Sequence, residues 1–283
     1  MALRRLELPT SWGPLLVAGG SRAGEGTLIL LPQLRLALDA GRPHRALPPM
    51  STVFLSHGHL DHIGAVGYWA SQRFLGSMRR GVLLTPAAIA DDVRRLLDLH
   101  ASLEGGRPYD VEVIPVSDGG SHALRRDMEL VFFATDHWVP TLGARLVWRK
   151  HRLRPELSGL PEEEIAHRRR AGEEVDETLL LPLLSYTADT GPGLFTAHPE
   201  ALDAEIVLLE CSFWRPADRD RARAFGHLHL DDLLAVAPSL RCRHLVLLHP
   251  SRRHRLGEAS RVVREQIAPA LSGEAHSLAV DWE

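Results

Sequence analysis

The stretch LSHGHLDHIG, residues 55–64, places three histidines and one aspartate within six positions. A strongly apolar run that predicts a β-strand leads into it. His57 and His59 alternate on an extended turn, so their rings can converge on one ion, while Asp61 and His62 can reach a second. Imidazole and carboxylate groups suit zinc and similar ions. The stretch therefore predicts a site for two neighbouring metal ions.

Four side chains cannot complete the coordination of two ions, because each ion takes about four protein or solvent ligands. Further candidates occur downstream: FATDHWVPTLG contains His137, SYTADTGP contains Asp189 and LVLLHPSRRH contains His249. Each of these residues follows a strongly apolar run. Since an α/β scaffold commonly builds a site from the ends of different strands, we expect the three to join the first four.

The composition indicates a globular protein. The chain has 283 residues, 45% of them hydrophobic, which is enough for a large core and excludes a disordered or fibrous protein. No signal pattern opens the sequence and no apolar run approaches the ~20 residues that span a bilayer, so we expect neither secretion nor membrane insertion, and a cytoplasmic location. Two cysteines are too few for a disulfide framework. A formal net charge of −3 leaves nucleic-acid binding to local basic patches.

Short strand-like runs alternate with helical stretches along the whole chain, without an internal sequence repeat. This pattern predicts one α/β domain over residues 1–283, with a helix starting near Ile63. Residues 149–178 interrupt the alternation with a highly charged segment that is too long for an ordinary connection. This segment is interpreted either as a solvated insertion or as an arm that contacts RNA.

Eight further histidines stand apart or beside loops and charges, and we interpret them as surface or structural residues. They are His44, His100, His122, His151, His167, His198, His244 and His276.

Four stretches carry a family resemblance. They are FLSHGHLDHIGA, FATDHWVPTLGARLVWRKHRLRPELSGLPEEEI, LLSYTADT, and the end from LLECSFW through GHLHLDD to LLHPSRRH. Together they resemble the metallo-β-lactamase fold and, within it, the short plant-type tRNase Z (ribonuclease Z). The resemblance spans nearly the full length and implies an αββα sandwich of two mixed β-sheets flanked by helices. The chain departs from the family after His249, where Pro250 to His254 replace the usual Phe-Ser-Ser-Arg-Tyr, although Arg253 keeps the guanidinium.

The resemblance also implies a role for each candidate ligand. His57, His59 and His137 would hold one divalent ion, Asp61, His62 and His249 the other, and Asp189 would bridge them. The implied ions are two Zn²⁺, with Mn²⁺ as the alternative. Two ions ~3.5–4 Å apart can clamp both oxygens of an in-line displacement at phosphorus.

A departing 3′ oxygen also needs a proton, which the family supplies from a histidine held by a glutamate. Here His227 and Glu210 occupy the matching positions, and with Asp61 they are the predicted catalytic residues. Two alternatives stay open: His229 could act instead, or both histidines could cap the helix that begins at Asp231.

The resemblance predicts an endoribonuclease that removes the 3′ trailer of precursor tRNA by attack of a metal-activated hydroxide and leaves a 3′ hydroxyl on the tRNA. Expected RNA contacts are Arg149, Lys150, Arg152, Arg154, Arg168 to Arg170 and Arg253. A homodimer is expected from the resemblance alone. The alternatives are a hydrolase of small phosphodiesters or other esters, and a module that binds metal without catalysis.

Overall fold

The computed structural model describes residues 3–282 and contains two seven-stranded β-sheets. The first sheet contains, in spatial order, β1 (Arg4–Thr10), β2 (Gly13–Arg22), β3 (Gly26–Leu31), β4 (Leu36–Leu38), β5 (Thr52–Phe54), β6 (Gly81–Pro86) and β7 (Val111–Val116). The second contains β8 (Ser121–Arg125), β9 (Met128–Ala134), β10 (Leu142–Leu153), β11 (Asp176–Tyr186), β12 (Ile206–Glu210), β13 (His244–Leu248) and β14 (Glu274–Ser277). In each sheet the first four strands pair antiparallel and the last four pair parallel, so both sheets are mixed.

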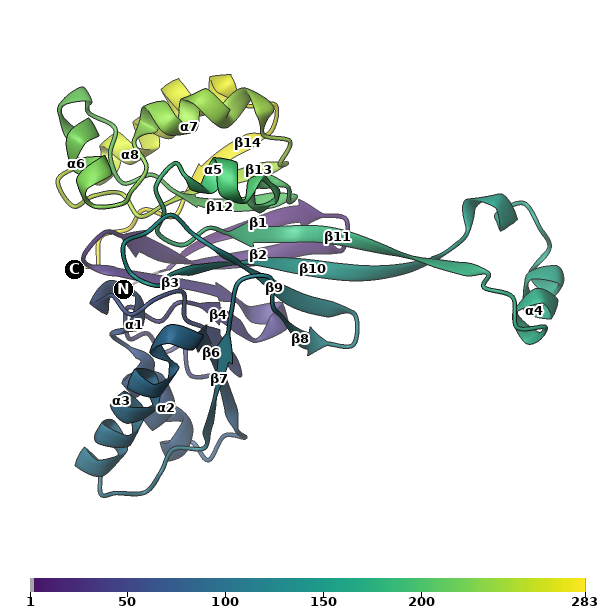
Figure 1. The fold of residues 1–283 in the computed structure, drawn as a ribbon, viewed down its shortest axis with the longest axis horizontal. Helices are drawn as coiled ribbons and strands as arrows, with labels where there is room; N and C mark the ends of the chain where they lie inside the picture. The colour runs from purple at the N-terminus through teal and green to yellow at the C-terminus, as the bar shows by residue number, and fades with distance from the viewer. Residues whose placement is uncertain (1–2, 283) are drawn as a thin grey trace.

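Helices cover the outer faces of the two sheets (Figure 1). The helices of residues 3–282 are α1 (Leu60–Ile63), α2 (Val66–Leu75), α3 (Ala90–Leu103), α4 (Glu162–Arg170), α5 (Leu194–Ala197), α6 (Arg219–Ala224), α7 (Leu230–Val236) and α8 (Leu256–Val262), of which α4 lies away from the sandwich. Helices α2 and α3 lie against the first sheet, and α7 and α8 against the second. This arrangement confirms the predicted αββα sandwich. None of the helices in residues 3–282 is long and apolar enough to cross a membrane.

The central core lies between the sheets, where apolar side chains alternate inward along the strands of both. Phe54 of the first sheet and Phe132 of the second stack with ring centroids 5.3 Å apart, and both are fully buried. Two outer cores hold the helices, with Trp69 of α2 in one and Leu233 of α7 in the other. Burial of this apolar surface is the main force that brings the ends of the two sheets together.

One predicted helix boundary is wrong. The helix expected to start near Ile63 begins at Leu60, directly after the extended residue His59. The Ile63 amide donates to the His59 carbonyl at 3.0 Å, which closes a single turn. One turn is too short to produce a recognisable apolar period, so the sequence pattern revealed only the longer α2 that follows. As a consequence Asp61 and His62 lie on a helix rather than on a turn.

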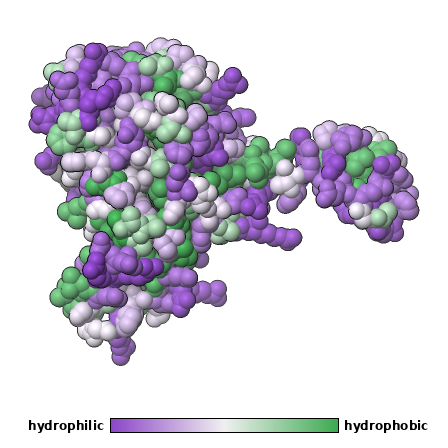
Figure 2. Space-filling model, in the orientation of Figure 1, coloured by the Kyte–Doolittle hydropathy of each residue, from purple (hydrophilic) through white to green (hydrophobic). Residues whose placement is uncertain are grey.

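Residues 149–178 form an arm that projects from the sandwich (Figure 1). β10 and β11 continue beyond the second sheet as a two-stranded ribbon, and α4 lies at its far end. Hydrophobic surface follows the stem of the arm, where Leu180 is 61% exposed (Figure 2).

Candidate metal centre and active site

Seven side chains from both sheets meet at one edge of the sandwich. His57 and His59 lie in the loop after β5, and Asp61 and His62 follow on α1. The remaining three, His137, Asp189 and His249, come just after β9, β11 and β13. The structure therefore brings together all seven residues that the sequence predicts as ligands, from positions up to 192 residues apart.

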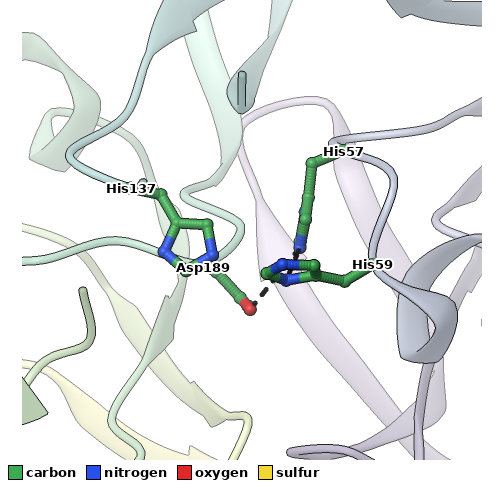
Figure 3. A group of neighbouring side chains, drawn as sticks. All are labelled: His57, His59, His137 and Asp189. Atoms are coloured by element: carbon green, nitrogen blue, oxygen red, sulfur yellow. Dashed lines mark hydrogen bonds and ion pairs between the residues drawn. The ribbon is translucent and has the colours of Figure 1, made fainter. Parts of the chain in front are cut away.

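The first group consists of His57, His59, His137 and Asp189, whose donor atoms all lie within 4.8 Å of one another. The His57 Nε2 lies 3.0 Å from the His59 Nδ1 and 3.7 Å from the Asp189 Oδ2. Figure 3 shows the imidazoles of His57 and His59 on one side of the carboxylate and His137 on the other.

The second group consists of Asp61, His62 and His249. The His249 Nε2 lies 3.3 Å from the Asp61 Oδ2 and 3.4 Å from the His62 Nε2. Zinc bonds of about 2.0–2.2 Å in a tetrahedron place neighbouring donor atoms about 3.3–3.6 Å apart, so these separations suit one ion.

Asp189 faces both groups. Its Oδ1 lies 3.4 Å from the His62 Nε2, and its Oδ2 lies 3.4 Å from the His249 Nε2 and 3.7 Å from the His57 Nε2. A carboxylate with these neighbours can bridge two cations.

Hydrogen bonds fix the orientation of four of the imidazoles. The Nδ1 of His62 donates to Asp39 at 2.7 Å, and the Nδ1 of His137 donates to the Gly226 carbonyl at 2.9 Å. The Ser56 hydroxyl lies 3.0 Å from the Nδ1 of His57, and the Ser212 hydroxyl lies 3.0 Å from the Nδ1 of His249. Each of these hydroxyls donates to a carboxylate, so it can accept from the histidine.

Because Nδ1 of each of these four rings is engaged, the inward-facing Nε2 is left as the lone-pair donor, the tautomer that a metal ligand needs. The Nε2 of His137 is buried and has no hydrogen-bond partner. Since a buried unpaired nitrogen is costly, this atom fits the bound cation that the fold implies.

Asp39 has a supporting role that the sequence alone did not reveal. This carboxylate is fully buried and accepts hydrogen bonds from the Ser56 amide at 2.7 Å, His62 at 2.7 Å and the Tyr186 hydroxyl at 2.5 Å. The one sequence signal was an aspartate directly after the apolar run LRLAL. Its partners are far apart in sequence, so the role appears only in the fold.

Three residues around the site adopt a left-handed backbone that non-glycine residues rarely take. The φ angles are 59° at Asp39, 52° at Ala188 and 57° at His249. Such conformations cost of order 1–3 kcal/mol each and persist only where the surroundings enforce them. They cluster here because the chain must turn sharply at a strand end to aim a ligand inward.

The electrostatics of the cluster favour bound positive charge. Burial lowers the pKa of His57 well below its usual value, and burial also lowers the pKa of His59 and His137, so these rings are neutral donors. Burial opposes the charged form of His62 as well, but Asp189 and Asp39 outweigh it and raise the pKa of His62 well above the usual value. Burial would raise the pKa of Asp189, yet His249 and His62 lower it. The site thus stabilises ionised carboxylates and a cation beside them.

Glu210 and His227 form a pair at the edge of the ligand cluster. The His227 Nδ1 donates to the Glu210 Oε1 at 2.7 Å, and the amides of Thr190 and Ser212 also donate to this buried carboxylate at 3.0 Å. Burial would lower the pKa of His227, but Glu210 raises it to about 9, so the imidazole is protonated at neutral pH. Its ring lies 5.2 Å from the ring of His249.

His229, the alternative acid, serves a different purpose. Its side chain caps α7 by accepting from the Asp231 amide, and its Nε2 donates to the Arg215 carbonyl at 3.0 Å. With both ring nitrogens engaged and the side chain buried, His229 is a helix cap. His227 points to Glu210 instead and does not share this role.

The predicted RNA contacts lie in two places. Arg253 lines a cavity next to His227, together with Arg252, Arg221 and Phe225. The other predicted contacts lie along the arm, outside the ligand cluster, where Arg149 pairs with Glu129, Arg152 with Glu177, Arg154 with Glu174, Arg168 with Glu164 and Arg169 with Asp176. Lys150 lies over the ring of Trp148.

Comparisons with known proteins agree with this geometry. The family model described as Beta-lactamase superfamily domain matches residues 20–250. The protein named tRNase Z TRZ1 of Arabidopsis thaliana is 28% identical over 266 residues, which cover 93% of this chain and 94% of the relative. The chloroplastic tRNase Z TRZ2 of the same plant is 30% identical over 251 residues, covering 87% and 70%.

Solved structures with the same fold include the metallo-beta-lactamase fold protein YhfI from Bacillus subtilis, with a TM-score of 0.61 at 18% identity, covering 91% of this chain and 92% of that one. Human tRNase Z, short form, matches with a TM-score of 0.59 at 15% identity, covering 93% and 95%.

The sandwich and its histidine and aspartate cluster define the class: this is a hydrolase of the metallo-β-lactamase fold that uses divalent metal ions. Sequence likeness over most of the chain narrows the class further. The chain belongs to the tRNase Z family within the beta-lactamase superfamily, which confirms the resemblance seen in the sequence.

Proposed function

We propose that this protein is an endoribonuclease that removes the 3′ trailer of precursor tRNA and leaves a 3′ hydroxyl on the tRNA. The observation that carries the proposal is the meeting of two ligand groups around Asp189 with the Glu210–His227 pair beside them. A module that binds metal only for structure has no need of a protonated histidine at the edge of its ligands. The proposed substrate, precursor tRNA, is inferred from relatives named tRNase Z or ribonuclease Z.

His57, His59 and His137 would hold one divalent ion, and Asp61, His62 and His249 a second, with Asp189 between them. Zinc is the proposed metal, because imidazole nitrogens and carboxylate oxygens at these separations suit it, and manganese is the alternative. When bound, such ions polarise a phosphodiester and bring the pKa of water into the neutral range.

The residues of the chain supply positioning and proton transfer. Asp39, Ser56 and Ser212 hold ligand histidines by their outer nitrogens, so the donor atoms need not reorganise when substrate arrives. His227 is proposed as the general acid: Glu210 engages its Nδ1, which leaves the Nε2 proton for the 3′ oxygen of the tRNA as the bond to phosphorus breaks.

Aromatic side chains beside the ligands suit an unpaired RNA end. The Trp138 ring is 66% exposed and lies 6.3 Å from the rings of both His59 and His137, and the half-exposed Phe225 is 6.2 Å from it. Bases of single-stranded RNA stack on such rings, and Arg221 and Arg253 in the adjacent cavity can pair with phosphates. A small ester substrate would not need this surface.

The arm is proposed to dock the folded part of the tRNA. Residues 149–178 contain seven Lys or Arg and eight Asp or Glu, so the arm is not strongly basic as a whole. Its arginines pair largely with its own carboxylates, and these pairs would have to exchange with phosphates on binding. Replacing residues 151–175 by a short turn should raise KM for precursor tRNA and leave hydrolysis of bis-p-nitrophenyl phosphate unchanged. Unaltered tRNA cleavage would dispose of the docking role.

A homodimer is also proposed, and the continuous apolar surface along the stem of the arm, where Leu180 is exposed, supports it, because such patches commonly mark an interface (Figure 2). Light scattering of the wild type and of Leu180→Lys would test it, with a monomeric wild type as the contrary result. The cytoplasmic location stays a prediction, tested by fractionating the host cells.

The function is tested by incubating the metal-loaded protein with precursor tRNA and, separately, with bis-p-nitrophenyl phosphate. Mapping of the new 3′ end should place the cut at the end of the tRNA body and detect a 3′ hydroxyl. Turnover of the small phosphodiester without cleavage of the tRNA would favour the alternative hydrolase.

A further inference from the structure

Three potential metal ligands lie together on the second sheet, away from the active site. His244 is the first residue of β13, and Glu274 and His276 belong to the parallel edge strand β14. In the register of the two strands His244 is opposite Glu274, and His276 follows two positions later on the same face. The sequence pattern placed both histidines among the surface or structural residues, because each stands apart or beside loops and charges.

The donor atoms form a nearly equilateral triangle. The His244 Nδ1 lies 3.3 Å from the His276 Nε2, and the Glu274 Oε2 lies 3.5 Å from each of these nitrogens. Tetrahedral zinc with bonds of about 2.0–2.2 Å needs donors about 3.3–3.6 Å apart. The three atoms therefore already occupy three corners of such a tetrahedron, and the same nitrogen of His244 faces both partners.

Burial and access also suit an ion. The side chain of His244 is 7% exposed, that of His276 21% and that of Glu274 71%. One ligand is thus fixed in the protein interior while another reaches into solvent, which leaves an entry path and a fourth position open to water. The backbone of Glu274 is anchored, because its amide donates to the Arg243 carbonyl at 2.8 Å.

This cluster is separate from the catalytic ligands. His244 starts β13 and His249 follows its end, and a strand rises about 3.3 Å per residue, so about 16 Å separate the two positions.

We propose that His244, Glu274 and His276 form a further site for a divalent transition metal of the zinc type, with solvent as the fourth ligand. Its role is structural: it joins the edge strand β14 to β13. Zinc sites with two histidines, one carboxylate and water are chemically ordinary, and three protein ligands suffice for binding.

The joined strand matters because it leads into the segment that ties the two sheets together. The Ser21 amide of β2 donates to the Leu278 carbonyl at 3.0 Å, and the Trp282 indole donates to the Gly26 carbonyl at 2.8 Å. The Ser21 hydroxyl in turn accepts from the amide of His249 at 3.0 Å. An ion on β14 would therefore steady the end of the chain against β2 and β3.

The test counts zinc bound to the full-length protein after equilibrium dialysis against zinc sulfate, for wild type, Glu274→Gln and His276→Ala. Glu274→Gln keeps the shape of an exposed side chain, so it should fold normally. His167→Ala, which removes an exposed imidazole from α4, is the matched control. Both cluster variants should bind one zinc fewer than wild type and the control, with hydrolysis of bis-p-nitrophenyl phosphate unchanged. The imidazole NMR signals of His276 should shift when zinc is added to wild type.

Equal zinc content in all four proteins, or no zinc-induced shift of His276, would overturn the proposal and leave a hydrogen-bonded triad. A loss of zinc accompanied by a loss of hydrolysis would also overturn it, because the missing ion would then belong to the catalytic cluster.

Discussion

Replacement of Asp39 by asparagine should weaken metal binding although Asp39 is not a predicted ligand. Its Oδ1 accepts from the Ser56 amide at 2.7 Å, so an asparagine must keep its carbonyl oxygen there. The amide nitrogen would then stand in place of Oδ2 and face the Nδ1 of His62, now 2.7 Å from that oxygen. Two N–H groups cannot bond each other, so His62 would lose its acceptor and favour the tautomer with the proton on Nε2. That nitrogen is the one aimed at the ion.

The expected loss of zinc affinity follows from the usual effect of removing the hydrogen-bond partner of a ligand histidine. Their loss typically weakens metal affinity by about 10–100-fold, which is about 1.4–2.7 kcal/mol. The upper part of this range is expected here, because Asp39 is fully buried and water cannot replace the lost acceptor. Zinc affinity is measured by competition with a chromophoric chelator, and hydrolysis of bis-p-nitrophenyl phosphate at limiting zinc should fall in parallel. Excess zinc should restore much of the rate.

Asp110→Asn is the matched control, since it removes a carboxylate from an exposed pair with Arg80. Its zinc affinity should equal that of wild type. Wild-type affinity in Asp39→Asn, with the protein folded, would refute the view that Asp39 sets the tautomer of His62.

Three other outcomes are expected. His227→Ala should retain its metal ions while turnover of precursor tRNA falls about 10²–10⁴-fold, and loss of metal by elemental analysis would mean that His227 is a ligand. Trp138→Ala should weaken binding of precursor tRNA by about 1–3 kcal/mol and leave turnover of bis-p-nitrophenyl phosphate unchanged. The control Phe74→Ala on α2 should leave both RNA binding and turnover unchanged. Equal RNA affinity in wild type and both variants would exclude stacking on Trp138. Burial, together with Arg215, lowers the pKa of His254 to about 4 in the folded protein, whereas about 6.5 is expected in the unfolded chain. The unfolded state therefore binds more protons between these two pH values. The stability that the neutral His254 gives the folded protein is fully present above pH about 6.5 and is lost as the pH falls toward about 4. In denaturant titrations, His254→Phe should lose up to about 3 kcal/mol less free energy of unfolding than wild type over this pH range. Identical pH dependence of the free energy of unfolding in both proteins would contradict this.

The ligand cluster was the most predictable part of the molecule. His57 to His62 are close in sequence, and His137, Asp189 and His249 each follow an apolar run that forms a strand. Because residues that follow different strands can meet at one edge of the fold, the local sequence pattern was enough to predict that these side chains lie together. The fold class followed from the same runs and from the family resemblance.

What escaped prediction depends on tertiary pairing. β14 is a four-residue edge strand, Glu274–Ser277, with no apolar alternation, and only its pairing with β13 makes it a strand. The same pairing brings His276 to His244. Asp39 acquires its role from partners on α1 and β11, which no short stretch of sequence contains. Sequence periodicity reports burial of one element, not which elements become neighbours.

The two sheets repeat one strand order, with four antiparallel strands followed by parallel ones, and this doubling has a consequence for the active site. In each half the strand at which the direction changes, β4 or β11, is followed by an aspartate: Asp39 in one and Asp189 in the other. The two carboxylates occupy equivalent positions in the two sheets but have different roles. Asp39 orients His62, whereas Asp189 faces the proposed ions. Catalysis on this scaffold therefore belongs to the seam between two similar halves, and neither half alone would contain a complete reaction centre.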